Sequence, residues 1–494
     1  MSIFSGQTPT PHDLKEWLSN LPLANTGRSI EALSHKVLEI EACAYPALKQ
    51  VTYLTQFLPL IQAFYEISEN AIRLSAPHSL PLSYQDTRAL EKLISQLIES
   101  YMQTVRAMQE EAHALPFVGE VIYNALWLCS KRLRLVYLNY ETPPQDLWAH
   151  IHQLYLYAEK WALEEHLHTA QPQEPGSIAE MYKTLVLLGT AHTNELSPSE
   201  MIHLYQNLLF WNHYTHILRH KDQEKYITIP VDSDMPPQYR DMPIVEPFEA
   251  HSRLLSTQDL LAHLHRAIQQ HEGESLTQQA SLSLSALKKI YHGWFDFSTR
   301  KLHRQTKQYQ VELCIGLVPT HQALSTWLNA QTLSRSSVTE KTIQLPDLTE
   351  ATIIDTSPRG YGLEGDFNKT ALHIGQLVGL YKQAYPLAYW RIGMVQWIHK
   401  LNARITRAGL ILLGASVYPA ALVMAQGNRT HPYPVLLLKE NQEDKLFHAI
   451  VLPAFFTKHP EKMHIEIDQK IKTLHVGERL YSSQKYEVYT CEIE

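Results

Sequence analysis

The periodicity of the apolar residues changes once along this 494-residue chain, near residue 300, and this change limits the folds available to it. Before that point apolar residues recur three and four positions apart, as Leu90, Leu93 and Ile94 do, which gives a helix one apolar face. After it, short runs rich in β-branched, aliphatic and aromatic residues alternate with turn residues, which is typical of strands. We therefore expect an α+β multidomain protein, with an all-α N-terminal region followed by antiparallel β-structure.

The helical pattern predicts several helices separated by polar loops. Asp86 is placed to cap the helix that carries Leu90. A proline-rich stretch at about 229–247 predicts a long loop or an extended arm, because proline lacks a backbone donor. Other helices are expected near residues 120–138, 147–168, 178–190, 198–219 and 278–291.

Composition and charge describe a folded protein without a general affinity for polyanions. Hydrophobic residues make up 45% of the chain and charged residues 19%. The formal net charge of -7 gives no global attraction to a nucleic acid polymer. The apolar stretch Ala408–Ala425 is broken by Gly409, Gly414 and Pro419, so it predicts two short buried strands and no membrane span.

The cysteines and the N-terminus favour a cytoplasmic location. The first residues lack a basic stretch followed by an apolar run, so they do not resemble a signal peptide. The cysteines lie far apart without metal-ligand spacing, which favours reduced thiols: Cys43, Cys129, Cys314 and Cys491.

Two short motifs at the start of the strand-rich region combine groups that suit a nucleotide with phosphates and flat bases. Arg300 and Arg304 form an RxxxR motif, and Asp355, Ser357 and Gly360 form a DxSxxG motif. A guanidinium binds phosphate or guanine acceptors through paired hydrogen bonds and can stack on a base. A carboxylate accepts from guanine N–H groups, and a serine hydroxyl adds a short polar contact. A glycine lets the backbone turn tightly and approach a ligand.

The two motifs, in this order, resemble the signature of PilZ domains, the bacterial receptors for cyclic di-GMP. The later segments Gly375–Gly379, Arg391–Trp397 and Arg407–Leu412 are similar to the way in which PilZ barrels end, so the resemblance covers about 300–413. It implies a PilZ-like antiparallel barrel at 293–415, and the periodicity of the preceding residues predicts a helical domain at 1–292. The remaining residues, 416–494, carry more strands than one small barrel needs, and predict either an additional β-rich subdomain or an extension of the barrel.

The resemblance implies a ligand, cyclic di-GMP, and no separate cofactor or metal. Residues at about 316–340, between the motifs, form a longer insertion than is usual for the family; a helix is predicted at His321–Thr332, and it could cover the site. Arg391 is interpreted as surface charge and Trp397 as barrel core. The implied ligand-binding residues are Arg300, Arg304, Asp355, Ser357, Gly360 and Arg359.

Two other classes of site have weaker support. Gly360–Gly365 matches GxGxxG, but no apolar-periodic helix follows, so a glycine-rich turn is the preferred interpretation. His213, His216 and His220 would share one face of a helix, near the acidic and histidine residues at 164–168. Without an HExxH motif or an evident carboxylate partner, a metal-dependent hydrolase is disfavoured. We therefore expect no enzyme.

The expected function is that of a cytoplasmic receptor. Cyclic di-GMP would bind the barrel, and the helical domain would couple binding to an unidentified protein partner, in control of motility, pili, attachment or biofilm formation. The alternative is a ligand-free PilZ-like adaptor that acts through protein–protein contacts. The intact motifs argue against the adaptor, whereas the long insertion argues for it.

Overall fold

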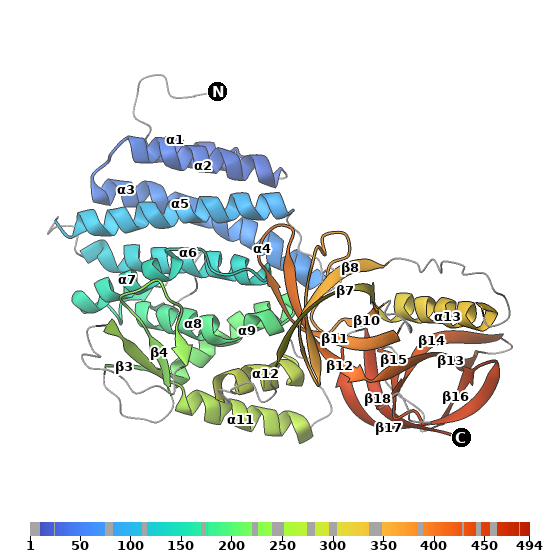
Figure 1. Cartoon of the computed structure of the whole chain (residues 1–494). Coiled ribbons are helices and arrows are strands. Elements are labelled where there is room, and N and C mark those ends of the chain that lie inside the picture. Colours follow the sequence, from blue (N-terminus) through green and yellow to red (C-terminus); the bar gives the residue numbers. More distant parts are fainter. Residues whose placement is uncertain are drawn as a thin grey trace. The chain divides into compact units, whose positions relative to one another are not determined.

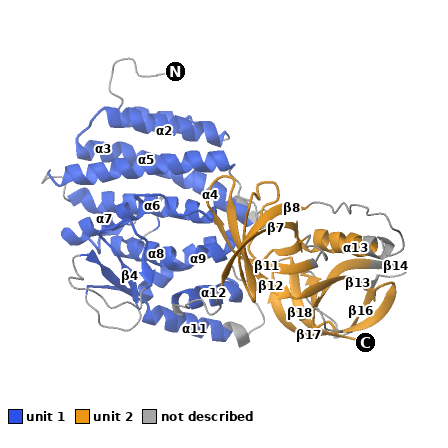
Figure 2. Ribbon diagram, viewed as in Figure 1, with its two compact units in different colours: residues 1–298 blue, residues 299–494 orange. Residues whose placement is uncertain are grey.

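The computed structural model forms two compact units, Met1–Ser298 and Thr299–Glu494, which are coloured separately in Figure 2. The first unit is mainly helical and the second consists of antiparallel barrels, so the expected fold class is confirmed. No helix in the described ranges is long and apolar enough to cross a bilayer. The structure describes residues 10–23, 25–74, 83–110, 116–168, 174, 176–219, 226–239, 251–273, 282–295, 304–334, 348–382, 389–426, 429–440, 446–454, 462–483 and 485–494.

The first unit packs its longer helices side by side around one central helix, α6 (Figure 1). Nearly all of the side chains on α6 are buried, so this helix is enclosed on every side. The α-helices described in the first unit are α1 (Pro11–Ser19), α2 (Thr26–Ala42), α3 (Ala47–Leu54), α4 (Leu58–Leu74), α5 (Tyr84–Met108), α6 (Val118–Leu138), α7 (Leu147–Lys160), α8 (Ile178–Thr190), α9 (Pro198–Trp211), α11 (Gln258–Gly273) and α12 (Leu284–Phe295).

Helix α5 illustrates both the success and the limits of the periodicity argument. Its predicted stripe, which includes Leu90 and Leu97, is fully buried. The helix begins earlier than expected, because the cap is Ser83, whose side chain accepts from the backbone N–H of Asp86. Asp86 lies in the first turn, where its negative charge faces the positive end of the helix dipole.

The first unit also contains short strands that the sequence pattern did not predict. β3 (His216–Leu218), β6 (Arg253–Ser256), β4 (Tyr226–Ile229) and β5 (Gln238–Tyr239) form one antiparallel sheet in that order. β1 (Leu167–His168) pairs with β2 (Gly176–Ser177). Helix α9 ends at Trp211, so His213 lies in a 3-10 turn and His216 in β3. The predicted helical histidine face is therefore wrong; His220 lies outside the described residues.

A buried histidine joins the loop after β4 to helices α7 and α8. His152 Nε2 lies 3.1 Å from the carbonyl oxygen of Met235, which can only accept, so Nε2 carries the proton. The other nitrogen, Nδ1, then accepts from the Tyr182 hydroxyl at 2.8 Å. Burial lowers the pKa of His152 to about 4.

This neutral histidine predicts an acid-labile first unit. In the unfolded chain His152 takes up a proton below its ordinary pKa, whereas the folded protein resists it until about pH 4. Stability is therefore complete above pH 6.5 and is lost as the pH falls, by about 2 kcal/mol at pH 5. Urea unfolding of the wild type and His152→Gln at pH 7 and pH 5 measures this. We expect the variant to lose about 2 kcal/mol less than the wild type; equal losses would show that His152 is not the cause.

The second unit begins with a closed six-stranded antiparallel barrel. Around the barrel the strands follow the order β10-β11-β12-β9-β8-β7, and β7 closes against β10. β9 corrects the prediction of a glycine-rich turn after the DxSxxG motif, because all of Gly360–Gly365 pairs as a strand. The strands are β7 (Gln305–Ile315), β8 (Thr349–Ser357), β9 (Gly360–Gly365), β10 (Leu377–Lys382), β11 (Tyr389–Lys400) and β12 (Thr406–Gly414).

The last strands form a second closed barrel, which answers the question that the sequence left open. Its order is β13-β14-β15-β18-β17-β16. The apolar stretch Ala408–Ala425 is divided between β12 and β13, as expected for two strands. The strands are β13 (Ser416–Gln426), β14 (Arg429–Lys439), β15 (Ala449–Pro453), β16 (Lys462–Ile467), β17 (Lys470–Ser482) and β18 (Tyr486–Ile493).

The insertion between the motifs contains the predicted helix, α13 (Leu317–Ser334). It packs against β7 and β10 of the first barrel and against β13 and β14 of the second. Thr320 and His321 anchor its first turns, through hydrogen bonds to the carbonyl oxygens of Cys314 at 3.1 Å and Ala420 at 2.9 Å. The described part of the insertion thus joins the two barrels.

Candidate ligand-binding site

The structure brings one residue of each motif into direct contact. Arg304 immediately precedes β7, and Asp355 lies near the end of β8, which pairs with it. Arg304 Nη1 donates to both carboxylate oxygens of Asp355, at 2.7 and 3.0 Å. The two side chains are 26% and 25% exposed, so a ligand can reach them. Because both contacts use Nη1, the pair does not engage the Nε and Nη2 edge, which can bind phosphate through two parallel hydrogen bonds.

The second half of the DxSxxG motif is a tight connection between β8 and β9. Ser357 and Gly360 form the last pair of the two strands, and the Ser357 hydroxyl donates to the Gly360 carbonyl at 3.3 Å. Gly360 is required for a steric reason, and not for the turn conformation that we expected. A Cβ at this position would lie 2.5 Å from the carbonyl oxygen of Leu410 on β12, so any side chain would force these strands apart.

Asp355 belongs to a row of outward-facing residues that crosses five neighbouring strands. β-Bulges interrupt β7, β8 and β11 directly beside this row. Bulges redirect side chains and are frequent at barrel rims and beside functional sites. We call this row the site row; its members are Thr306, Asp355, Gly362, Gly409 and Trp397.

Two glycines lie in the middle of the site row beneath larger side chains. Gly362 and Gly409 pair with each other across β9 and β12, and both are buried. A Cβ on Gly362 would lie 2.8 Å from the Asp355 carboxylate, and one on Gly409 would lie 1.9 Å from Trp397 Nε1. The carboxylate and the indole therefore lie over the two glycines, close to the backbone. We call this surface, with an acceptor on one side and an aromatic ring on the other, the glycine shelf.

Trp397 corrects the prediction that it belongs to the barrel core. It is half-buried and covers Gly409 on the outer surface. The cause is the bulge in β11, where an extra residue separates the Val395 and Trp397 pairs. If β11 were regular at this point, strict alternation would give Trp397 the same orientation as Val395, whose side chain is fully buried.

The remaining predicted site residues have different positions. Arg300 lies outside the described residues. Arg359 is exposed in the turn between Ser357 and Gly360, and its carbonyl accepts from the backbone N–H of Leu412 at 2.9 Å. Arg391 alternates with Trp390 and Ile392, which pack outward, so it points to the inner side of β11 and away from the site row.

The alternative sites found in the sequence do not acquire a supporting geometry. Gly360–Gly365 is one strand of an antiparallel barrel, so it cannot open a dinucleotide-binding helix. Within the described ranges, no three His, Cys, Asp or Glu side chains are arranged to hold a metal ion.

Comparisons with known proteins agree with this geometry. The family described as "Cyclic-di-GMP receptor FimW, N-terminal domain" matches residues 12–222. The family described as "Cyclic-di-GMP receptor FimW, middle PilZ domain" matches residues 227–344 and 322–419. Residues 227–419 belong to the PilZ-domain family of cyclic di-GMP receptors. The PilZ match ends at residue 419, so it includes the first barrel and only the start of β13.

A curated relative extends the similarity to most of the chain. The protein "Cyclic-di-GMP receptor FimW" of Pseudomonas aeruginosa is 24% identical over 518 aligned residues, which cover 90% of this chain and 82% of the relative. The helical unit, whose family could not be identified from the sequence, is therefore similar to the N-terminal domain of a receptor that also contains a PilZ domain.

Proposed function

We propose that this chain is a receptor that binds cyclic di-GMP on the outer face of its first barrel. The observation that carries the proposal is the Arg304–Asp355 pair beside the shelf formed by Gly362 and Gly409. Arg304 and the site row together provide a cation, an acceptor and an aromatic ring, each of which matches one feature of a cyclic purine dinucleotide. Membership of the PilZ family and the printed name of the curated relative support the same ligand.

Each candidate ligand-binding residue has a distinct role in this proposal. Arg304 binds a phosphate or a guanine acceptor edge through its unused nitrogen pair. Asp355 accepts from guanine N–H groups, and the hydroxyl of Ser357 adds a polar contact. A base packs against the partly exposed indole of Trp397, beside the Asp355 carboxylate. Arg300 and Arg359 supply further positive charge to the phosphates.

Calorimetric titration of the full chain with cyclic di-GMP tests the proposal, with 5′-GMP as a control that has one base and no ring of phosphates. We expect saturable binding of cyclic di-GMP at micromolar or lower concentration, and much weaker binding of 5′-GMP. If the well-folded chain binds neither ligand, the receptor proposal fails, and the ligand-free adaptor becomes the better interpretation.

The glycine shelf predicts a steric effect on binding. In Gly409→Ala the new methyl group would overlap the Trp397 indole, which must move from its position. The base then loses its aromatic neighbour, so we expect binding about tenfold weaker, which is about 1.4 kcal/mol. Titration measures the affinity, and the emission maximum of the tryptophans reports the displacement. Unchanged affinity in Gly409→Ala would place the base elsewhere.

The helical unit is proposed to carry the output. In this proposal it binds a protein partner and links ligand binding to control of motility, pili, attachment or biofilm formation. Its similarity to the N-terminal domain of a cyclic di-GMP receptor supports a shared use of both parts. Cross-linking in cells with raised cyclic di-GMP, comparing the wild type with Arg304→Ala, tests it. Proteins captured equally by both would not be ligand-dependent partners.

A further inference from the structure

The second barrel repeats the strand connectivity of the first. If the six strands of each barrel are numbered from one in chain order, both barrels follow the order 1-2-3-6-5-4 and close from strand four to strand one. Every neighbouring pair in both is antiparallel. The second barrel therefore has the topology of a PilZ barrel, although the PilZ match ends where it begins.

A shared irregularity strengthens this correspondence. Strand five of the first barrel contains one extra residue immediately before Trp397, which pairs with Gly409. Strand five of the second barrel contains two such bulges, before Arg479 and before Tyr481, and Tyr481 pairs with Val488. A bulge inserts one residue and changes which face the following side chains occupy. We take the bulge before Tyr481 as the equivalent one, because Tyr481 and Val488 face outward from their barrel, as Trp397 and Gly409 do.

The register identifies the second barrel's equivalent of the site row. The site row of the first barrel contains polar residues and glycines, whereas the equivalent row of the second barrel is apolar. Neither the RxxxR nor the DxSxxG motif recurs in residues 416–494. In each of the following pairs of equivalent positions, the residue of the first barrel is named first: Asp355 and Leu436, Ser357 and Leu438, Gly362 and Val451, Gly409 and Val488, and Trp397 and Tyr481.

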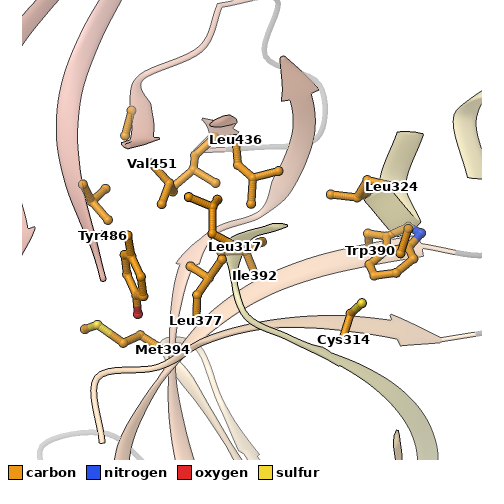
Figure 3. Close-up of a cluster of buried hydrophobic side chains, with 14 of the residues drawn as sticks. Cys314, Leu317, Leu324, Leu377, Trp390, Ile392, Met394, Leu436, Val451 and Tyr486 are labelled. Carbon is orange, nitrogen blue, oxygen red and sulfur yellow. The ribbon is translucent and has the colours of Figure 1, made fainter. Parts of the chain in front are cut away.

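This apolar row is buried against the first barrel and α13. Leu436 and Val451 are fully buried in one cluster with Leu317 of α13 and Ile392 of β11 (Figure 3). They do not belong to the interior of their own barrel, which forms a separate cluster of alternate residues such as Ile450. A hydrogen bond from the Tyr486 hydroxyl of β18 to the Gly375 carbonyl, just before β10, joins the two barrels beside this cluster.

We propose that the second barrel is a motif-free copy of the PilZ barrel, in which the face equivalent to the site row has become a docking surface for the first barrel. Its occupant is the wall formed by β10, the first half of β11 and α13; β10 lies across the first barrel from the shelf strand β9. The chain thus keeps one nucleotide face, on the first barrel, and uses the other as an internal contact. Within this proposal, only the statement that the first barrel's site row binds a nucleotide rests on the proposed function.

Hydrogen exchange of the full chain tests the docking surface. Val451→Asp introduces a charge into the buried contact, whereas Ile471→Asp makes a similar change on β17 of the same barrel, where the side chain is 66% exposed. We expect Val451→Asp to accelerate amide exchange at least tenfold in residues 317–327 and 390–394, which belong to α13 and β11. Ile471→Asp should leave those segments unchanged. If Val451→Asp does not fold, the isosteric Val451→Thr should accelerate exchange in the same segments by about threefold.

Two results would overturn the inference, and they differ from failure of the receptor proposal. Unchanged amide exchange in residues 317–327 and 390–394 of a folded Val451 variant would show that the apolar row of the second barrel does not stabilise the first barrel or α13. Residual cyclic di-GMP binding by Arg304→Ala, photo-crosslinked to residues 429–453, would show that the second barrel kept a site. If the wild type does not bind cyclic di-GMP, the receptor proposal fails alone, because the exchange experiment needs no ligand.

Discussion

Arg304→Ala is expected to weaken binding of cyclic di-GMP at least 100-fold while leaving the fold intact. The substitution removes charge-assisted hydrogen bonds to the ligand, which contribute about 1.5–3 kcal/mol each, and it removes a positive charge beside two phosphates. In the free protein the same arginine donates to a partly exposed carboxylate, and an exposed ion pair contributes about 0–1 kcal/mol. Binding and stability should therefore respond very differently. Calorimetric titration measures the first, and thermal unfolding the second.

Two further variants separate the shape of the guanidinium from its charge. Arg304→Lys keeps the charge but loses the planar fork, so we expect an intermediate loss of about tenfold. Arg479→Ala removes the arginine of another cross-strand pair, with Glu487 at 3.1 Å in the second barrel, and should leave affinity within about twofold. If Arg304→Ala binds cyclic di-GMP as tightly as the wild type does, Arg304 is not a ligand contact. The same conclusion follows if Arg479→Ala loses as much affinity as Arg304→Ala.

The site motifs could be read from the sequence because they are local. Asp355, Ser357 and Gly360 lie within six residues, so one strand end and one turn place them together. The pairing of β7 with β8 brings Arg304 to Asp355; the sequence predicts strands near both motifs but not their pairing. The reason for Gly360 was less accessible, because the limiting atom is a carbonyl oxygen on β12, about 50 residues later in the chain.

The shelf was missed because it depends on bulges and on pairing between distant strands. Gly362 and Gly409 are visible as glycines in the sequence, but only the pairing of β9 with β12 makes them adjacent. Alternation along β11 would place Trp397 in the core with Val395, and it fails because one extra residue enters the strand. Local composition does not encode such an insertion, since its cost depends on the partner strand.

The repeated barrel was hidden for a related reason. Residues 416–494 contain apolar segments typical of strands but no polar motif. The sequence therefore predicts that strands are present and does not predict which strands pair. Leu436 and Leu437 illustrate the difficulty: the first packs against the other barrel and the second against its own barrel's interior. A strand that is buried on both faces reads as a continuous apolar run, without the alternation that assigns its faces.

The second large effect is expected in the helical unit, where Arg134→Met should lower the free energy of unfolding by about 3–5 kcal/mol. Arg134 is almost fully buried on α6; it donates to Glu69 of α4 and lies 3.8 Å from Glu174. Its guanidinium also lies 3.6 Å from the centre of the Tyr205 ring. Removing the arginine leaves two poorly solvated carboxylates, of which Glu174 keeps Lys131 at 3.0 Å. Urea unfolding followed by helical circular dichroism measures the loss.

The chain offers a control with the same partner. Arg73 lies 3.7 Å from Glu69 and is 40% exposed, so Arg73→Met should cost less than about 1 kcal/mol. The double variant Arg134→Met with Glu69→Gln should regain part of the loss, because the stranded charge is then removed as well. Equal losses in Arg73→Met and Arg134→Met would mean that burial adds nothing to this pair. Failure of the double variant to recover would instead assign the loss to the packing of Arg134 on Tyr205.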